Sequence, residues 1–199
     1  QERIKRLKVQ DEPWGVAILP DGSKAYVTNT VSGTVSVVTR SPKGRLKKPK
    51  LHIPVGTEPY GIAVTPNGTR VFVANARSNT VSVIDTATDT VISTITTVGL
   101  EPRGLAITND GDTDDTDEDI YVTQFLARPV AGKVDGFDDA KAGHVTRIPG
   151  GASFGVQDII LDPLADTGFR ANGDALARIA PGASFTFTTG AYPNQLNGI

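Results

Sequence analysis

The chain has 199 residues, a formal net charge of −2 at pH 7, no cysteine and no methionine. The length suffices for one domain with a sizeable core, and the weak net charge argues against a nucleic-acid partner. The lack of cysteine excludes disulfides, thiol nucleophiles and thiolate metal sites, and no apolar run approaches the roughly 18 residues of a membrane helix. Because methionine is absent, we expect the sequence to be a processed or excised segment of a longer chain. Because no long apolar run is present, we expect that it does not span a membrane.

Arg3–Val9 is the first predicted strand, since it precedes a Glu-Pro-x-Gly motif as Ile92–Val98 does further on. Strands then follow within residues 14–56, including Lys24–Asn29 and Thr34–Val38. The connection between the third and fourth strands is basic. Its cations are Lys43, Arg45, Lys47, Lys48 and Lys50. Two interpretations stay open for Lys43–Lys50: a solvated loop, or a surface for an anionic partner such as a polysaccharide or lipid headgroup.

Residues 58–100 hold four short apolar runs separated by turn residues, the pattern of an antiparallel meander. The predicted strands are Gly61–Thr65, Arg70–Asn75, Thr80–Asp85 and Thr90–Thr97. Pro66-Asn67-Gly68 forms the first turn, in which proline fixes φ and glycine supplies a positive φ.

The meander is a repeat. Glu12–Ile18 matches Glu58–Val64 position for position, and Glu101–Ile107 begins a third copy. The strand-opening glycines Gly15, Gly61 and Gly104 are 46 and 43 residues apart. Four strands in a period of this length are typical of a β-propeller blade.

The third copy, 101–190, is elaborated. Its predicted strands are Gly104–Thr108, Asp119–Phe125, His144–Ile148 and Ser184–Thr189, with insertions at 109–119, 126–143 and 149–183. Within the last insertion, Asp158, Asp162 and Asp166 recur every four residues, and Pro163 argues against a long helix. We therefore expect residues 156–166 to form a short helical or turn element that caps the blade rim. Residues 193–199 open a further blade. The sequence therefore predicts an all-β, partial β-propeller: three four-stranded antiparallel blades at 14–56, 58–100 and 101–190, plus flanking strands of incomplete blades, Arg3–Val9 being the last strand of a preceding one.

The run Tyr26–Asn29 (YVTN), with the motifs GIAVTPNGTRVFVAN and NTVSVIDTATDTV, resembles the YVTN-type β-propeller repeat family. That family is similar to surface-layer proteins and to lactonase-like and amine-dehydrogenase-like seven-bladed propellers. The resemblance implies the fold and an extracellular, cell-surface or periplasmic location. It does not imply a reaction, because one scaffold serves many functions.

A candidate binding surface consists of Trp14, Tyr60 and Arg103, the residues just before each strand-opening glycine. In a propeller these positions surround the mouth of the central channel. We expect them to bind a ligand there, beside the 126–143 loop; alternatively, they fill the gap between adjacent innermost strands.

The 109–119 insertion is a candidate calcium site, because hard carboxylate oxygens suit Ca²⁺. Its aspartates are Asp110, Asp112, Asp114, Asp115, Asp117 and Asp119. Asp115 and Tyr121 stand where an EF-hand has glycine and a bidentate glutamate, so only an irregular site is expected. A solvated loop balanced by bulk ions is the alternative.

No catalytic constellation emerges. His52 and His144 lie in different blades, and His144 is expected to be a half-exposed strand residue. We therefore predict a non-catalytic binding or scaffold module of an extracytoplasmic protein. Its partners would be the remaining blades of the protein or further propeller subunits. The alternative is the N-terminal part of a lactonase-like or quinoprotein-dehydrogenase-like enzyme with its catalytic residues outside this segment.

Overall fold

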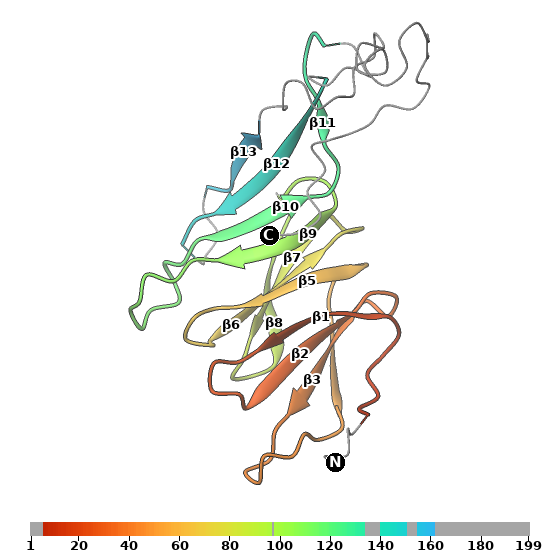
Figure 1. The fold of residues 1–199 in the computed structure, drawn as a ribbon, viewed down its shortest axis with the longest axis vertical. Coiled ribbons are helices and arrows are strands. Elements are labelled where there is room, and N and C mark those ends of the chain that lie inside the picture. Colours follow the sequence, from red (N-terminus) through yellow and green to blue (C-terminus); the bar gives the residue numbers. More distant parts are fainter. Residues whose placement is uncertain (1–5, 97, 134–139, 151–154, 162–199) are drawn as a thin grey trace, which may run out of the picture.

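Three antiparallel sheets lie side by side along the long axis of the computed structural model, which describes residues 6–96, 98–133, 140–150 and 155–161 (Figure 1). These residues contain strands, turns and loops and no helix. Hence they include no helix able to cross a membrane. The predicted fold class, an all-β partial β-propeller, is confirmed.

Blade 1 is a four-stranded sheet in chain order. Its strands are β1 (Pro13–Ile18), β2 (Lys24–Asn29), β3 (Thr34–Thr39) and β4 (Leu51–Pro54). The described part of the predicted strand Arg3–Val9 is not a strand, because the described residues offer it no neighbouring strand to pair with. Leu7 and Val9 instead line a pocket on the face of this sheet.

Blade 2 repeats the arrangement. Its strands are β5 (Pro59–Val64), β6 (Arg70–Asn75), β7 (Thr80–Asp85) and β8 (Thr90–Ile95). The predicted bounds of the two central strands are confirmed, because well-defined turns flank both. The outermost strand ends two residues earlier than expected.

The innermost strands begin at Pro13, Pro59 and Pro102, two residues before the predicted glycine in each blade. In β1 and β5 the register with the next strand shifts just after the proline, so the strand continues through a bulge. Proline suits the first position of a strand, where no ladder donor is needed.

Blade 3 carries the insertions (Figure 1). Its strands are β9 (Pro102–Ile107), β10 (Ile120–Gln124), β11 (Arg128–Pro129), β12 (Lys141–Ile148) and β13 (Gln157–Leu161). β12 is longer than predicted, because its first residues pair with β11 inside the predicted 126–143 insertion.

The fourth place in blade 3 is taken by β13, which pairs with β12 inside the predicted 149–183 insertion. Asp158 therefore lies in a strand, and the helical or turn element expected over 156–166 is wrong for Gln157–Leu161, while its remainder lies outside the described residues. The run Gln157–Leu161 pairs along its whole length with β12, and the proline that suggested a turn comes after its end. The predicted strand Ser184–Thr189 and the blade opening at 193–199 lie outside the described residues.

Two apolar cores separate the three sheets. The first joins blades 1 and 2, with Tyr26, Val35 and Ile53 facing Val71 and Ile84. The second joins blades 2 and 3, and its largest members are Phe72, Val81, Ile120, Val122 and Ile148. The sheet of blade 2 thus buries one face against blade 1 and the other against blade 3, which fixes the relative position of the three innermost strands.

Candidate functional site

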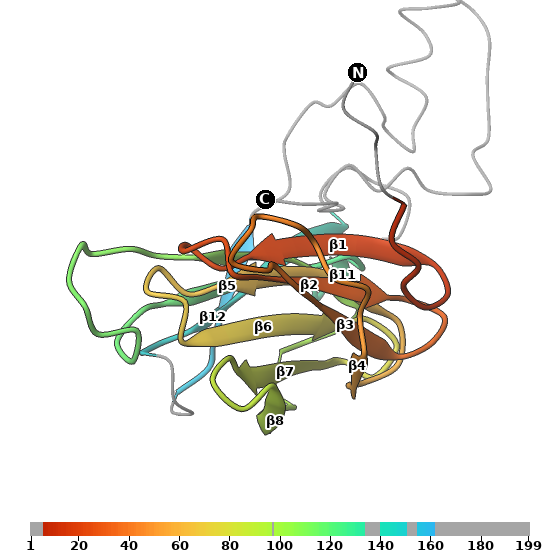
Figure 2. The ribbon, with the colours of Figure 1, turned by 90° about the horizontal axis from the view of Figure 1, so that it is seen from below.

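The innermost strands β1, β5 and β9 are neighbours in that order (Figure 1). In Figure 2, β1 and β5 lie along one side of the molecule. The predicted mouth residues Trp14, Tyr60 and Arg103 are the second residue of each. The Trp14 and Tyr60 rings meet edge to face, with centroids 5.2 Å apart. The Arg103 guanidinium lies 4.6 Å from the centroid of Tyr60. The structure thus brings all three together in one row.

Arg103 is held from several sides. Its guanidinium also lies 3.8 Å from the ring centroid of Phe125, and one terminal nitrogen lies 3.3 Å from a Glu101 carboxylate oxygen. Within the described residues its buried Nε atom has no hydrogen-bond partner. A cation between two aromatic faces is attracted by both ring quadrupoles. Its orientation is therefore set by blade 3 and by Tyr60 together.

Trp14 is the accessible end of the row. Its side chain is 70 % exposed, whereas Tyr60 and Arg103 are half-buried. Tyr60 and Arg103 pack on each other across two adjacent innermost strands. The indole ring remains open to a ligand.

Phe125 was missed by the sequence interpretation, although it belongs to the same row. The signal was present: Thr30 and Ala76 occupy the same position after the second strand in blades 1 and 2. An aromatic residue in the third copy alone marks a departure from the repeat.

Backbone packing positions the mouth. The Gly15 amide donates to Thr28 Oγ1 over 2.8 Å, and that hydroxyl donates to the Tyr60 carbonyl over 2.9 Å. A Cβ atom at Gly61 would lie only 2.0 Å from the Arg103 carbonyl oxygen, and one at Gly15 would lie 2.7 Å from the Tyr60 carbonyl oxygen. The innermost strands therefore approach one another as closely as glycine permits.

The acidic loop between β9 and β10 docks on blade 2 through Asp115, which is buried. Its carboxylate accepts hydrogen bonds from the hydroxyls of Thr65 and Thr69, at 2.7 and 2.6 Å, and from the amides of Asn67 and Thr69, at 2.8 and 3.0 Å. Burial alone would raise the pKa of Asp115, but these hydrogen bonds outweigh it and lower the pKa to about 2. Asp115 therefore fastens two blades together.

The other acidic residues divide into two groups. Asp110 and Asp117 gather with Glu118, and one carboxylate oxygen from each lies within 4.8 Å of the others. Asp119 instead bonds Arg147 at 2.7 Å, while Asp112 and Asp114 accept backbone amides of their own loop. The geometry thus favours two of the six predicted ligands and adds Glu118, which the sequence interpretation omitted.

Slight desolvation raises the pKa of the exposed Asp117 carboxyl, and the negative charges of Asp110, Asp112 and Asp114 raise it further. A cation within this trio would relieve that repulsion.

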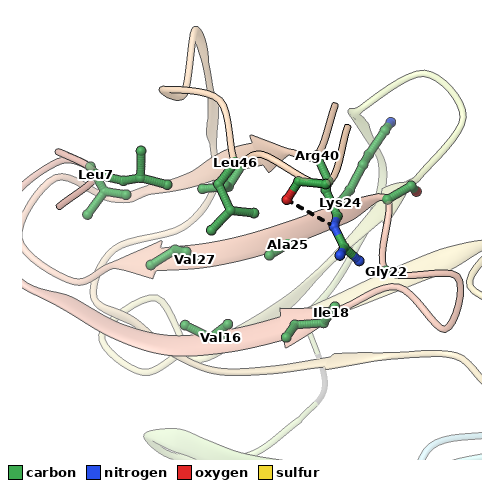
Figure 3. A pocket seen from close by; sticks show the side chains of 13 residues that line it. Leu7, Val16, Ile18, Gly22, Lys24, Ala25, Val27, Arg40 and Leu46 are labelled. Carbon is green, nitrogen blue, oxygen red and sulfur yellow. Dashed lines mark hydrogen bonds between the residues drawn. The ribbon is translucent and has the colours of Figure 1, made fainter. Parts of the chain in front are cut away.

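An apolar pocket of about 610 Å³ lies on the outer face of blade 1 (Figure 3). Val16 and Ile18, each 58 % exposed, line it with Val27 and Leu46. The predicted basic loop borders it, where Arg40 Nε donates to the Gly44 carbonyl over 3.3 Å. Its five predicted cations, Lys43, Arg45, Lys47, Lys48 and Lys50, are all exposed.

The two histidines make separate contacts. His52 Nδ1 lies 2.8 Å from Ser36 Oγ, and His144 Nδ1 lies 2.9 Å from an Asp158 carboxylate oxygen. His144 is buried rather than half-exposed, and its partner Asp158 on β13 also pairs with Arg128 of β11.

Comparison with known proteins agrees with this architecture. The family model described as "Lactonase, 7-bladed beta-propeller" matches residues 7–92, which cover blade 1 and most of blade 2. No curated protein sequence matches the chain significantly.

Several solved structures share the fold. Hydrazine synthase from Kuenenia stuttgartiensis is 24 % identical over 83 % of this chain and 58 % of its own, with a TM-score of 0.51. A protein of unknown function from Desulfotomaculum acetoxidans is 15 % identical over 81 % of this chain and 65 % of its own, also with a TM-score of 0.51. A proposed 6-phosphogluconolactonase from Bacteroides fragilis is 19 % identical over 76 % of this chain and 40 % of its own, again at 0.51.

The chain thus matches less than two thirds of the length of each of these three structures. At these identities the likeness extends to the fold. The chain is a partial β-propeller whose first two blades are similar to those of the seven-bladed lactonase-type propellers.

Proposed function

We propose that this chain is a ligand-binding module of a lactonase-like β-propeller, with the ligand held at the channel mouth. The observation that supports it is the continuous row of Trp14, Tyr60, Arg103 and Phe125, contributed by three blades. An exposed aromatic surface beside a positioned cation is unusual on a purely structural surface and common in binding sites.

The chemistry of the row favours a small ring-shaped ligand with an apolar face and oxygen acceptors, such as a sugar or a lactone. The face of Trp14 offers a stacking surface because its indole is 70 % exposed. Arg103 and the Tyr60 hydroxyl offer donors to ring oxygens or to a carbonyl.

A second candidate is catalysis by a lactonase-like enzyme that contains these blades. The family-model match over residues 7–92 favours it. Within the described residues, no nucleophile and base are held by a third group in an open site, so the reacting residues would come from further blades. In that case the row would position the substrate.

The remaining proposals concern the location of the protein, its partners and a bound cation. An extracellular, cell-surface or periplasmic location and a surface-layer role rest on the YVTN resemblance alone. Further blades or propeller subunits would cover the apolar face of blade 1. An anionic polymer or headgroup would bind at Lys43–Lys50, and Ca²⁺ would bind at the acidic trio.

The single tryptophan makes the mouth directly observable, because all indole fluorescence comes from Trp14. We expect titration with gluconolactone or glucose to change that fluorescence saturably. Arg103→Ala should weaken binding about tenfold, and Arg103→Lys should weaken it less, because it keeps the positive charge.

Val31→Ala is the matched control, since Val31 is an exposed apolar residue outside the row. A fluorescence response equal in Arg103→Ala and wild type would refute the mouth as the binding site. Release of the free acid from the lactone, catalysed by a longer chain and lost in its Arg103→Ala variant, would favour the enzyme.

A further inference from the structure

Each blade has the same four polar positions at the end of the sheet that faces the channel mouth. They are the last residue of the second strand, two residues of the third strand and the cross-strand partner on the fourth. In chain order the sets are Asn29, Thr34, Ser36 and His52; Asn75, Thr80, Ser82 and Thr94; Gln124, His144, Thr146 and Asp158.

Blade 1 provides an acceptor for both hydroxyls of its set, although the buried Asn29 Oδ1, like Asn75 Oδ1 in blade 2, has no partner among the described residues. The Asn29 amide nitrogen donates to Thr34 Oγ1 and Ser36 Oγ, at 3.0 and 2.9 Å. Each hydroxyl oxygen therefore accepts one hydrogen bond and keeps a proton to donate. Thr34 donates it to the side-chain oxygen of Gln10, and Ser36 lies 2.8 Å from His52 Nδ1.

Blade 3 also satisfies its set, with different chemistry. The Gln124 amide donates to Thr146 Oγ1 over 3.0 Å, and Thr146 donates onward to the Val98 carbonyl over 2.9 Å. Asp158 accepts from Arg128 at 3.1 Å and contacts His144 at 2.9 Å. In blade 3 the groups beside β12 are thus the long side chains of Gln124 and Arg128, together with His144 and Asp158.

Blade 2 leaves its set open. Asn75 donates to Thr80 Oγ1 and Ser82 Oγ at 3.0 and 2.9 Å, as in blade 1. No described group accepts the protons of these two hydroxyls. Thr94 replaces the histidine of blade 1, and a pocket of about 340 Å³ opens instead, between blade 2 and the end of β4.

The pocket has one polar and one apolar wall. Ser78, Thr80, Ser82 and Thr94 provide four hydroxyls, while Val55 and Val91 provide aliphatic surface. No residue that lines it is charged. A carboxylate would lose hydration there without a cation to compensate, so a neutral ligand with oxygen acceptors and an apolar face fits best.

We propose that this pocket binds a neutral polyhydroxylated ring of monosaccharide size. Its ring oxygen and hydroxyls accept the protons of Thr80 and Ser82, and its C–H face packs on Val55 and Val91. The ligand thus takes the place that the His52 imidazole has in blade 1. The site is separate from the channel mouth and does not depend on the function proposed there.

The test is an amide-resolved NMR titration of the full chain with glucose, glycerol and acetate. Glucose should shift the amides of Thr80, Ser82 and Thr94 saturably. Ser82→Ala should raise the dissociation constant about fivefold, in line with the loss of one hydrogen bond. Thr94→His should fill the pocket, abolish binding and raise the melting temperature, because the new imidazole reaches Ser82 as His52 reaches Ser36.

Ser36→Ala, the same substitution at the filled site of blade 1, is the control and should leave binding unchanged. Trp14→Ala separates the pocket from the mouth and should leave the three shifts unchanged. The proposal is overturned if glucose produces no shifts, if acetate binds more tightly than glucose, or if Trp14→Ala rather than Ser82→Ala removes the response.

Discussion

Gly61 shows how closely the innermost strands pack. Any Cβ at this position would overlap the Arg103 carbonyl oxygen of the next blade, which belongs to the backbone and cannot rotate away. A larger residue must therefore push β5 and β9 apart. The mouth row depends on this spacing, because Tyr60 and Arg103 flank the same contact.

We predict that Gly61→Ala lowers the free energy of unfolding by about 3 kcal/mol or more, above the usual cost of an extra methyl group in a packed core. Denaturant titration followed by circular dichroism measures it. Gly111→Ala is the control, since nothing lies within 4 Å of its Cβ and only its φ of 92° is strained. Equal effects of the two substitutions would contradict the close approach.

Asp115 is the second residue with a large expected effect. An amide in its place offers one acceptor atom instead of two, so donors from Thr69, Thr65 or Asn67 would lose their partner. A buried donor left unsatisfied costs about 1–3 kcal/mol. We expect Asp115→Asn to destabilise the chain by this amount near neutral pH.

The pH dependence has a definite sign. The folded pKa of Asp115 is about 2, below the ordinary aspartate value of 3.8. Its contribution is therefore complete above the unfolded pKa and is lost as the pH falls from about 4 through 2. Since one pKa unit corresponds to about 1.4 kcal/mol, about 2 kcal/mol should disappear over that range.

Unfolding free energies measured between pH 6 and 2 test this point. The acid-induced loss should shrink in Asp115→Asn and persist in Asp112→Asn, whose carboxylate bonds only a neighbouring amide of the loop. If the free energy of unfolding falls by the same amount between pH 6 and 2 in Asp115→Asn and in wild type, Asp115 is not the group responsible for the loss.

At the scale of elements, the acidic loop combines two roles on different residues. Asp115 anchors it to blade 2, and the Asp110, Asp117 and Glu118 trio carries the calcium proposal. We expect Ca²⁺ added after chelator treatment to release or absorb heat and to raise the melting temperature. Asp117→Asn should remove both effects, because it takes one negative ligand away. Asp112→Asn, outside the trio, should retain them. If the wild type shows neither heat of binding nor a change in melting temperature, the loop binds no Ca²⁺ and the alternative holds: a solvated loop balanced by bulk ions.

Most strands of blades 1 and 2 were predictable because short turns fix the ends of β2, β6 and β7. Blade 3 was harder. β11 becomes a strand only by pairing with residues of β12 far along the chain, and β13 was assigned to an insertion because the repeat spacing there is lost.

The site was predictable to a similar degree. The repeat alone placed Trp14, Tyr60 and Arg103 together, since equivalent positions of adjacent blades are neighbours. The repeat could not reveal the hydrogen bond between Asp115 and Thr65. Asp115 lies in an insertion that the other blades lack, so no equivalent position in the repeat indicates where its side chain packs. The density of negative charge suggested that the whole acidic loop binds a cation. The structure separates Asp115, which bonds blade 2, from the Asp110, Asp117 and Glu118 trio.

At the scale of the whole molecule, the two ends of the stack differ from its middle. The positions of Val16 and Ile18 are equivalent to those of Ile62 and Val64, which pack against blade 1. In blade 1 the same positions are exposed, each at 58 %. Exposed apolar faces of this kind favour association.

We predict that the chain associates in solution unless further blades cover this face. Light scattering coupled to size-exclusion chromatography should show a mass that rises with concentration. Ile18→Lys should reduce it, whereas Val31→Lys, on an exposed apolar residue of a hairpin, should not. A monodisperse, cooperatively melting wild-type monomer would contradict the prediction.

The four polar positions shared by the blades have a consequence for how such a repeat diverges. Asp158 is favourable beside His144 and Arg128, but the same aspartate at Thr94 would meet only hydroxyls. We therefore expect substitutions at these positions to be epistatic. A consensus sequence averaged over the repeats would mix incompatible members, so engineering of this scaffold should exchange whole sets between blades.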